Sequence, residues 1–181
     1  MPRVAAFLRA INVGGHNVKM ADLCAIFVKL GLKDAESFIA SGNIIFTAPA
    51  MAATTLQQKI ETALAATLGY DVPAFLRTES EVAAVAGYQP FPKPLFAAAN
   101  AFNVAFLADP LDAAARKLVA AMKTDIDDFH VNGREVYWLC KVRQSESKFS
   151  NAPFERALKR RATWRGMQSI QKLAAKHKFT A

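Results

Sequence analysis

The chain has 181 residues and a formal net charge of +8, and Leu, Ile, Val and Phe together make up 27% of it. This apolar content exceeds that of disordered chains and is enough for a packed core, in one large domain or two small ones. The sequence has no apolar run of about 18 residues and no signal-peptide cleavage pattern, so neither a membrane span nor secretion is expected. Its two cysteines, Cys24 and Cys140, form no disulfide framework or metal-binding pair, which favours a cytoplasmic location.

Hydrophobic periodicity and turn residues predict a βαββαβ order for the first 78 residues. The predicted elements are a strand over 3–10, a helix over 20–30, strands over 36–40 and 44–47, a helix over 54–68 and a strand over 72–78. Ser41-Gly42-Asn43 is typical of the turn between two hairpin strands. This order is that of the ferredoxin-like, split βαβ arrangement.

The second half repeats part of this pattern after a linking segment. A short helix over 80–87 precedes residues 89–95 (QPFPKPL), whose three prolines predict an irregular linker. The later elements are a strand over 102–107, a helix over 113–122, strands over 129–131 and 135–142 around Asn132-Gly133, a basic helix over 153–161 and a last helix over 167–178.

We therefore predict an α+β protein with two tandem ferredoxin-like (alpha-beta plait) domains, the second followed by basic C-terminal helices. The expected domains are residues 1–78 and 101–181, with a linking helix and a proline-rich linker over 79–100. Much of the positive charge lies near the end of the second domain. Its densest group is Arg156, Lys159, Arg160, Arg161 and Arg165. This basic cluster can attract phosphates or an acidic partner, or serve only as a solvated surface.

Three motifs resemble the bacterial "domain of unknown function 1697" family. They are Phe7–Gly15 (FLRAINVGG), Phe38–Phe46 (FIASGNIIF) and Ser147–Asn151 (SKFSN), in the order that the family shows. Two departures from the family pattern are Ala10, where members usually have glycine, and Thr163–Met167, where many members have an Arg-Asn-Trp run. The resemblance covers nearly the whole chain and implies tandem ferredoxin-like plaits, but it implies no activity.

The predicted topology places two polar segments at the same end of the first sheet. Asn12–Asn17 follows the first strand and Ser41–Asn43 precedes the third, so we expect them to be neighbours, with Tyr70 and Asp71 at the same end. Glycines allow a ligand to approach the backbone closely, and Arg9, Lys19 and a helix N-terminus favour an anion. The candidate ligand-binding residues are Arg9, Asn12, Gly14, Gly15, Lys19, Ser41, Gly42 and Asn43. The alternative, that these residues only form turns, stays open.

A second candidate anion site comprises Lys148, Ser150 and Asn151. Ser150 or Asn151 is expected to cap the basic helix and Phe149 to anchor in the core. A lysine at a helix start is unusual because the helix dipole repels cations there, so Lys148 and the helix N-terminus could hold an anion together.

Catalytic and metal-binding patterns are sparse, so whether the protein is an enzyme stays open. His16, His130 and His177 have no metal-ligand spacing, and His16 is the histidine near the glycine loop. We interpret Asp125, Asp127 and Asp128 as a solvated turn, because they lack the rest of a calcium loop. No Walker loop, GxGxxG fingerprint or GxSxG elbow occurs, and we expect no cofactor and no metal.

The function that these observations favour is the binding of a small polar or anionic ligand, such as one that contains phosphate, at the loop end of the first domain. One alternative is a nucleic-acid-associated module that uses the basic helix. An RNA-recognition platform is not expected, because Asn43 and Ile45 stand where its stacking aromatic side chains would be. Another alternative is a structural self-association module. No membrane partner is expected.

Overall fold

A computed structural model describes residues 2–12, 15 and 17–180 of the chain. The chain divides into two compact units, Met1–Ala84 with Leu173–Ala181, and Val85–Lys172. Both units are mixed α+β, and each contains one four-stranded antiparallel sheet. Within the described residues, no helix is long and apolar enough to cross a bilayer.

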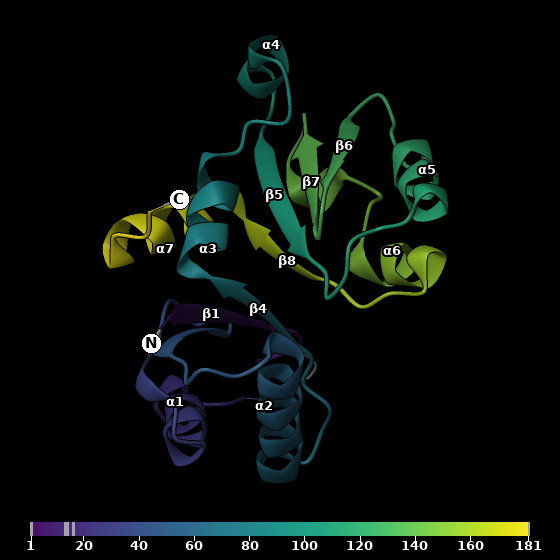
Figure 1. Ribbon diagram of the computed structural model, residues 1–181. Helices are drawn as coiled ribbons and strands as arrows, with labels where there is room; N and C mark the ends of the chain where they lie inside the picture. Colours follow the sequence, from purple (N-terminus) through teal and green to yellow (C-terminus); the bar gives the residue numbers. More distant parts are fainter. Residues whose placement is uncertain (1, 13–14, 16, 181) are drawn as a thin grey trace. The chain divides into compact units, whose positions relative to one another are not determined.

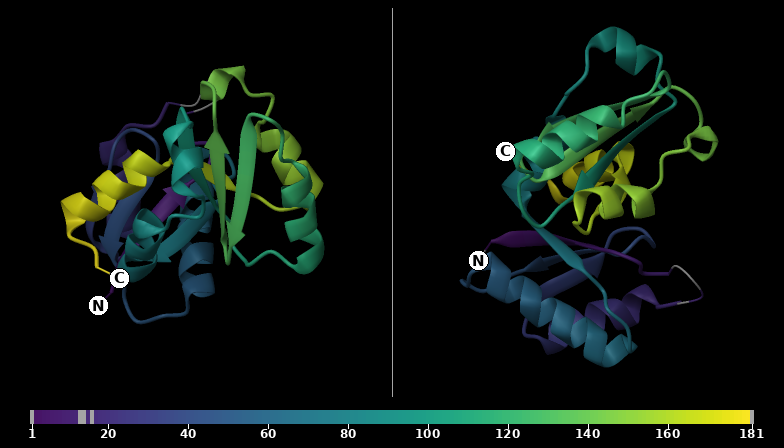
Figure 2. Two further views of the ribbon diagram at one scale, coloured as in Figure 1. Left: turned by 90° about the horizontal axis from the view of Figure 1, so that it is seen from above. Right: turned by 90° about the vertical axis from the view of Figure 1, so that its right-hand side faces the viewer.

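The first unit has the βαββαβ element order that the sequence predicts. Its elements are β1 (Arg3–Leu8), α1 (Met20–Lys29), β2 (Lys33–Ser37), β3 (Asn43–Thr47), α2 (Ala53–Leu68) and β4 (Ala74–Thr78). The strands are ordered β2-β3-β1-β4, and both neighbours of β1 run antiparallel to it. Helices α1 and α2 lie on the same side of this sheet (Figures 1 and 2).

The core of the first unit follows from the alternation of β1 and the apolar stripes of the two helices. Val4, Ala6 and Leu8 point to the helix side of the sheet, where they belong to a cluster of buried apolar residues. The helices contribute Leu23, Ile26 and Phe27 from α1 and Leu56, Ile60 and Leu64 from α2. Gly69 takes a left-handed conformation with φ 79° and ends α2.

The second unit has the same element order and an equivalent strand order. Two linking helices, α3 (Glu79–Gly87) and α4 (Lys93–Ala97), precede β5 (Ala101–Phe106), α5 (Ala113–Ala121), β6 (Asp127–Asn132), β7 (Glu135–Cys140), a 3-10 turn η1 (Gln144–Glu146), α6 (Asn151–Leu158) and β8 (Thr163–Gly166). The sheet order is β6-β7-β5-β8. Helices α5 and α6 pack on one face of this sheet through Ala115, Val119, Phe154 and Leu158 (Figure 1).

Strand β8 and helix α4 differ from the predictions. The sequence predicted no strand over 163–166, but this short segment pairs with β5, from Asn103 opposite Gly166 to Phe106 opposite Thr163. Residues 89–95 were predicted to be irregular, yet α4 begins within them. Pro94 is tolerated there because the first turn of a helix needs no intrahelical N–H donor.

The basic helix is shorter than predicted, and most of the basic cluster lies outside it. Helix α6 ends at Leu158, and Lys159 adopts a left-handed conformation with φ 52° that stops the helix. Arg160 and Arg161 therefore follow the helix, and Arg165 lies in β8.

The last helix, α7 (Met167–His177), begins in one unit and ends in the other. The expected division assigned 101–181 to the second domain and 79–100 to a linker. In the structure, Leu173–Ala181 groups with the first unit and residues 85–100 group with the second. The physical reason at the C-terminus is a set of contacts within the first unit: the Arg3 guanidinium donates to the carbonyl of His177 at 2.9 Å and lies over the ring of Phe179.

Candidate functional site

Three segments meet at one end of the first sheet. The backbone N–H of Leu8, the last residue of β1, donates to the carbonyl of Gly42 at 2.8 Å, and the N–H of Arg9 donates to the carbonyl of Pro73 at 2.9 Å. The β1–α1 segment, the β2–β3 turn and the α2–β4 connection are therefore adjacent here. This agrees with the expectation that the first two segments are neighbours.

The contact between the β1–α1 segment and the β2–β3 turn is close enough to favour glycine at position 42. A Cβ atom on Gly42 would lie 3.1 Å from Cβ of Ile11 and 3.3 Å from Cβ of Leu8. The φ of Gly42 is 73°, a conformation that L side chains rarely adopt. Gly42 thus serves the packing of two segments.

The polar side chains of the β2–β3 turn form a local network. Asn43 is fully buried, and its amide donates to the carbonyl of Phe38 at 3.1 Å and to Oγ of Ser41 at 2.7 Å. The backbone N–H of Phe38 donates in turn to the carbonyl of Asn43 at 2.9 Å. Asn43 and Ser41 therefore hold the shape of the turn, which is the structural alternative to a ligand-binding role.

Asn12 has a similar role in the β1–α1 segment. Its side-chain oxygen accepts a hydrogen bond from the backbone N–H of Val18 at 2.6 Å, which ties the two ends of this segment together. Gly15 has φ 90°. Gly14, a predicted ligand-binding residue, and His16, the histidine near the glycine loop, lie outside the described residues.

Three residues other than glycine near this end of the sheet have left-handed backbones. Ala10 has φ 60°, Asn12 has φ 58° and Ile39 has φ 52°. Asparagine tolerates this region, but alanine and isoleucine incur a steric penalty in it. Glycine adopts the φ of Ala10 without this penalty.

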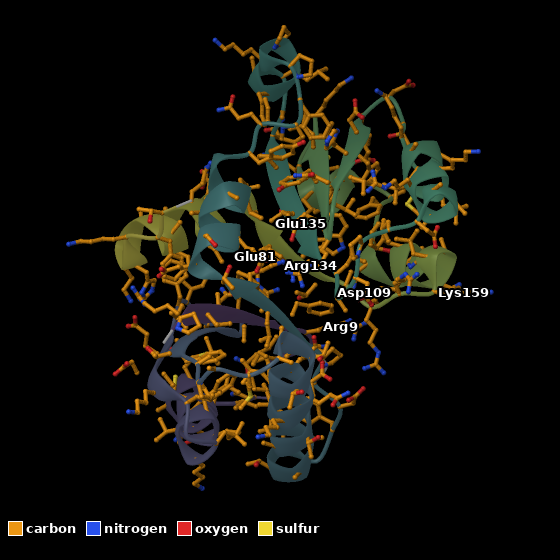
Figure 3. The ribbon with its side chains drawn as sticks, in the orientation of Figure 1. Arg9, Glu81, Asp109, Arg134, Glu135 and Lys159 are labelled. Atoms are coloured by element: carbon orange, nitrogen blue, oxygen red, sulfur yellow. The ribbon has the colours of Figure 1, made fainter. Side chains whose placement is uncertain are left out.

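Arg9 and Lys19 supply positive charge at the two ends of the β1–α1 segment. Arg9 is half-buried and lies just beyond the end of β1 (Figure 3), and Lys19 is exposed at the N-cap of α1. The first turn of α1 also contains Asp22, whose carboxylate opposes the attraction of the helix N-terminus for an anion. Attraction of an anion here would come from Arg9 and Lys19.

The second candidate cluster, around Lys148, is largely occupied by structural contacts. Ser150 is the N-cap of α6 but makes no side-chain capping bond, and Lys148 is exposed. The Asn151 amide accepts a hydrogen bond from the indole N–H of Trp164 at 3.0 Å and donates to the carbonyl of Ala162 at 3.4 Å. Phe149 packs in an aromatic cluster, 4.6 Å between ring centroids from Trp138, as expected of a core anchor.

The basic cluster is less concentrated than its sequence suggests. Arg165 is half-buried, and its guanidinium donates to Oγ1 of Thr163 and to the carbonyl of Trp164, both at 2.8 Å. Burial lowers the pKa of Arg165 to about 10, which leaves it charged at neutral pH. Arg160 lies 3.7 Å from the carboxylate of Asp112. Arg156 and Lys159 are exposed.

The cysteines lack the environment of a nucleophile. Burial raises the pKa of the Cys24 thiol and of the Cys140 thiol, so both are protonated at neutral pH. Within residues 2–12, 15 and 17–180, no cluster of three or more His, Cys, Asp or Glu side chains could hold a metal ion.

The interpretation of Asp127 as part of a solvated turn is wrong. Asp127 is only 4% exposed, and its carboxylate accepts hydrogen bonds from Trp138, Ser147 and Thr124. Asp125 is exposed, as expected. Asp127 is buried because it begins β6 and faces the aromatic cluster, a placement that depends on pairing with β7.

One pocket that the sequence analysis did not identify lies within the second unit. It has a volume of about 480 Å³ and is lined by residues of α4, β5 and the start of α7, among them Asn103. Asn103 is 6% exposed. An asparagine at an inward position of a strand that is otherwise apolar is the sequence signal that could have pointed to it.

Comparisons with known proteins show what this chain is similar to, but they do not indicate an activity. A family model described as "Protein of unknown function (DUF1697)" matches residues 1–137. The solved structure of a conserved bacterial protein, SP0830 from Streptococcus pneumoniae, is 26% identical in sequence to this chain. That match covers 98% of this chain and 99% of the other, with a TM-score of 0.74. A comparison with curated proteins found no match.

Proposed function

The chain belongs to the family described as protein of unknown function (DUF1697), and we propose that it binds a small anionic ligand at the end of the first sheet. The main support for this proposal is the contact between the β1–α1 segment and the β2–β3 turn. In this contact, the backbone N–H of Leu8 donates a hydrogen bond to the carbonyl of Gly42 at 2.8 Å. Loops that a rigid sheet holds in place are common binding sites. Membership of the family explains the motifs but supplies no ligand.

Backbone strain supports a binding role for this end of the sheet. Ala10 and Ile39 keep left-handed backbones on the two adjoining segments, with φ of 60° and 52°. Such strain persists only where surrounding contacts enforce it, and it is concentrated at functional sites. The hydrogen bonds of Asn12 to Val18 and of Asn43 to Phe38 help to hold these two segments in shape.

Arg9 and Lys19 are the residues that we assign to the ligand. A guanidinium presents a planar fork that matches a carboxylate or a phosphate, and an ammonium adds a point charge. Asn12 ties residue 12 to residue 18, which holds together the segment that carries both cations. The ligand class is therefore a small molecule with a phosphate or carboxylate group.

The test is a titration of the isotope-labelled protein with inorganic phosphate, followed by the backbone amide signals of Gly15 and Gly42. We expect Arg9→Gln to weaken the response about tenfold, the size of effect that a charged hydrogen bond carries. Lys29→Gln, which removes an exposed charge from the far end of α1, should leave binding unchanged. Equal binding by the Arg9 variant and the wild type would refute the proposal.

We also propose that each unit is a ferredoxin-like plait. Support comes from the βαββαβ element order of both units and from their strand orders, β2-β3-β1-β4 and β6-β7-β5-β8.

A cytoplasmic location is a further part of the proposal. Its support is that Cys24 and Cys140 are free thiols, as reducing compartments favour.

Association with nucleic acid has weaker support as a second function. Four exposed cations, Arg156, Lys159, Arg160 and Arg161, lie at and after the end of α6, but Arg160 is close to Asp112 and Arg165 is not exposed. A gel shift with RNA and DNA at about 50 mM salt tests it, because phosphate contacts are strongest at low salt. A complex that survives Arg9→Gln but is lost in Arg156→Gln/Lys159→Gln would favour nucleic acid over the small ligand.

A further inference from the structure

We infer that the pocket of the second unit binds a small organic anion, with the anionic group at Asn103 and the start of α7 and a planar apolar body against Phe96 and Phe102. The pocket has a volume of about 480 Å³, within the range of small-molecule sites. All of the residues that line it belong to the second unit.

The first observation behind this inference is the amide of Asn103. The residue is 6% exposed, and its Nδ2 atom is buried without a hydrogen-bond partner. Buried polar groups nearly always have a partner, because an unpaired one loses its bonds to water and gains nothing in return. A donor left in this state at the wall of a pocket points to an acceptor group on a ligand.

The second observation is the start of α7, which is adjacent to Asn103. Gly166, the last residue of β8, is opposite Asn103 in the sheet and directly precedes Met167, the first residue of the helix. The first N–H groups of a helix have no intrahelical partners and carry partial positive charge. The first turn of this 11-residue helix contains no acidic side chain that would cancel this charge.

Gly166 leaves the approach to Asn103 open. A Cβ atom at Gly166 would lie 3.9 Å from Oδ1 of Asn103, so a side chain here would stand beside the amide. Strand β5 continues past the end of β8, to Phe102 and Ala101, and these residues form the neighbouring wall. Asn103 and the first residues of α7 therefore line the same pocket.

The remaining lining residues define the rest of the ligand. The rings of Phe96 and Phe102 are perpendicular, with centroids 5.0 Å apart, and supply an apolar surface for a planar group. None of the described side chains that line the pocket is charged, so a single oxyanion fits better than a polyphosphate. A carboxylate and a phosphate ester share this chemistry.

Two other side-chain amides that line the pocket already have hydrogen-bond partners. The side chain of Asn100 donates to the carbonyl of Lys141 at 2.6 Å, and that of Gln171 donates to the carbonyl of Ala86 at 3.3 Å. Asn103 differs from both because its donor is buried and without a partner. This contrast provides a matched pair of variants.

The test is a titration of the isotope-labelled full-length chain with benzoate and with phenyl phosphate. Benzyl alcohol serves as the neutral probe and inorganic phosphate as the probe without a ring. We expect both aromatic anions to shift the side-chain amide signal of Asn103 and the backbone signals of Met167, Gln168 and Ser169. Asn103→Leu should weaken their binding tenfold or more, because it removes a hydrogen bond to a charged group.

The stability of the variants separates a binding role from a structural one. Asn103→Leu should not lower the melting temperature, since it replaces an unpartnered polar group by an apolar one of similar size. Asn100→Ala should lower the melting temperature but keep ligand binding. Gly166→Ala, with room for its Cβ, should keep the fold and weaken binding.

Three results would overturn the inference: no shift at Asn103 and Met167–Ser169 with millimolar aromatic anion, equal binding of benzyl alcohol, or undiminished binding by Asn103→Leu. Equal affinity for inorganic phosphate would likewise contradict the role of the two phenylalanines. The signals of Gly15 and Gly42 report the loop end of the first unit separately, so either site can fail without the other.

Discussion

The buried carboxylate of Asp127 accepts a hydrogen bond from the indole N–H of Trp138 at 2.8 Å. The same carboxylate accepts from Oγ of Ser147 at 2.8 Å and from Oγ1 of Thr124 at 3.2 Å. Trp138 is 2% exposed and packs against Phe149, so one acidic side chain links the start of β6, the middle of β7 and the segment before α6.

The first prediction concerns this network. Asp127→Ala should lower the free energy of unfolding by about 2–4 kcal/mol, because it leaves the buried indole N–H of Trp138 without a partner and creates a small cavity. Urea denaturation followed by tryptophan fluorescence measures the change. Asp125→Ala, at an exposed neighbour, is the control and should change stability by less than about 0.5 kcal/mol. A similar loss in both variants would contradict this role of Asp127.

The second prediction is that Ala10→Gly stabilises the protein. Ala10 has φ 60°, where a Cβ atom costs about 1–2 kcal/mol and glycine has no such cost. Glycine also raises the entropy of the unfolded chain, so we expect a net gain of about 0.5–1 kcal/mol. Chemical denaturation provides the measurement. The same substitution at Ala66, exposed in the last turn of α2, should instead destabilise, by up to about 1 kcal/mol.

The third prediction is the opposite change at Gly42. Gly42→Ala should destabilise by about 2–3 kcal/mol, because it forces a side chain into a φ of 73° and against Cβ of Ile11. Gly87→Ala serves as the control, since Gly87 ends a helix and no atom lies within 4 Å of the place that the added methyl group would take. A loss at Gly42 no larger than that at Gly87 would show that the two segments are not in tight contact.

The fourth prediction is a loss of stability in acid that depends on His177. Burial lowers the pKa of His177, and the positive charges of Lys176 and Arg3 lower it further, whereas Glu36 raises it. Nδ1 of His177 lies 2.8 Å from the Arg3 guanidinium and 3.0 Å from the Glu36 carboxylate. The unfolded chain therefore binds a proton at this residue more readily than the folded one does.

The sign of the effect follows from that difference. The stabilisation from neutral His177 is fully present above about pH 6.5, the unfolded pKa, and is lost as the pH falls through the lower pKa of the folded state. His177→Gln should flatten this part of the stability profile, measured by urea denaturation at pH steps. His130→Gln should leave it in place. An imidazole signal of His177 that titrates above pH 6.5 would contradict the prediction.

Much of the first unit could be predicted from local sequence patterns. Apolar residues at helical spacing predicted α1 and α2, and the turn residues before β3 predicted the hairpin. The motifs at residues 7–15 and 38–46 predicted the family, which the match over residues 1–137 confirms. Such elements can be predicted because the residues that bury one face of a helix or strand recur in the sequence with the period of that helix or strand.

Strand β8 and the burial of Asp127 could not be predicted in the same way. Four residues, Thr163–Gly166, are too few for a periodic signal, and they form a strand because β5 offers them an open edge. Asp127 looks like a turn residue beside Asp125 and Asp128, and only its partners on β7 and before α6 show that it is buried.

For the candidate site, the sequence alone determined that the β1–α1 segment and the β2–β3 turn should adjoin, because strand order fixes which ends of a sheet coincide. Only the tertiary structure decided that Asn12 and Asn43 are bonded to the backbone while the Nδ2 atom of Asn103 is buried without a partner. Hydrophobic periodicity is a local property of a chain. The partner of a polar atom depends on residues far away in sequence, and it is known only when the folded segments have been brought together.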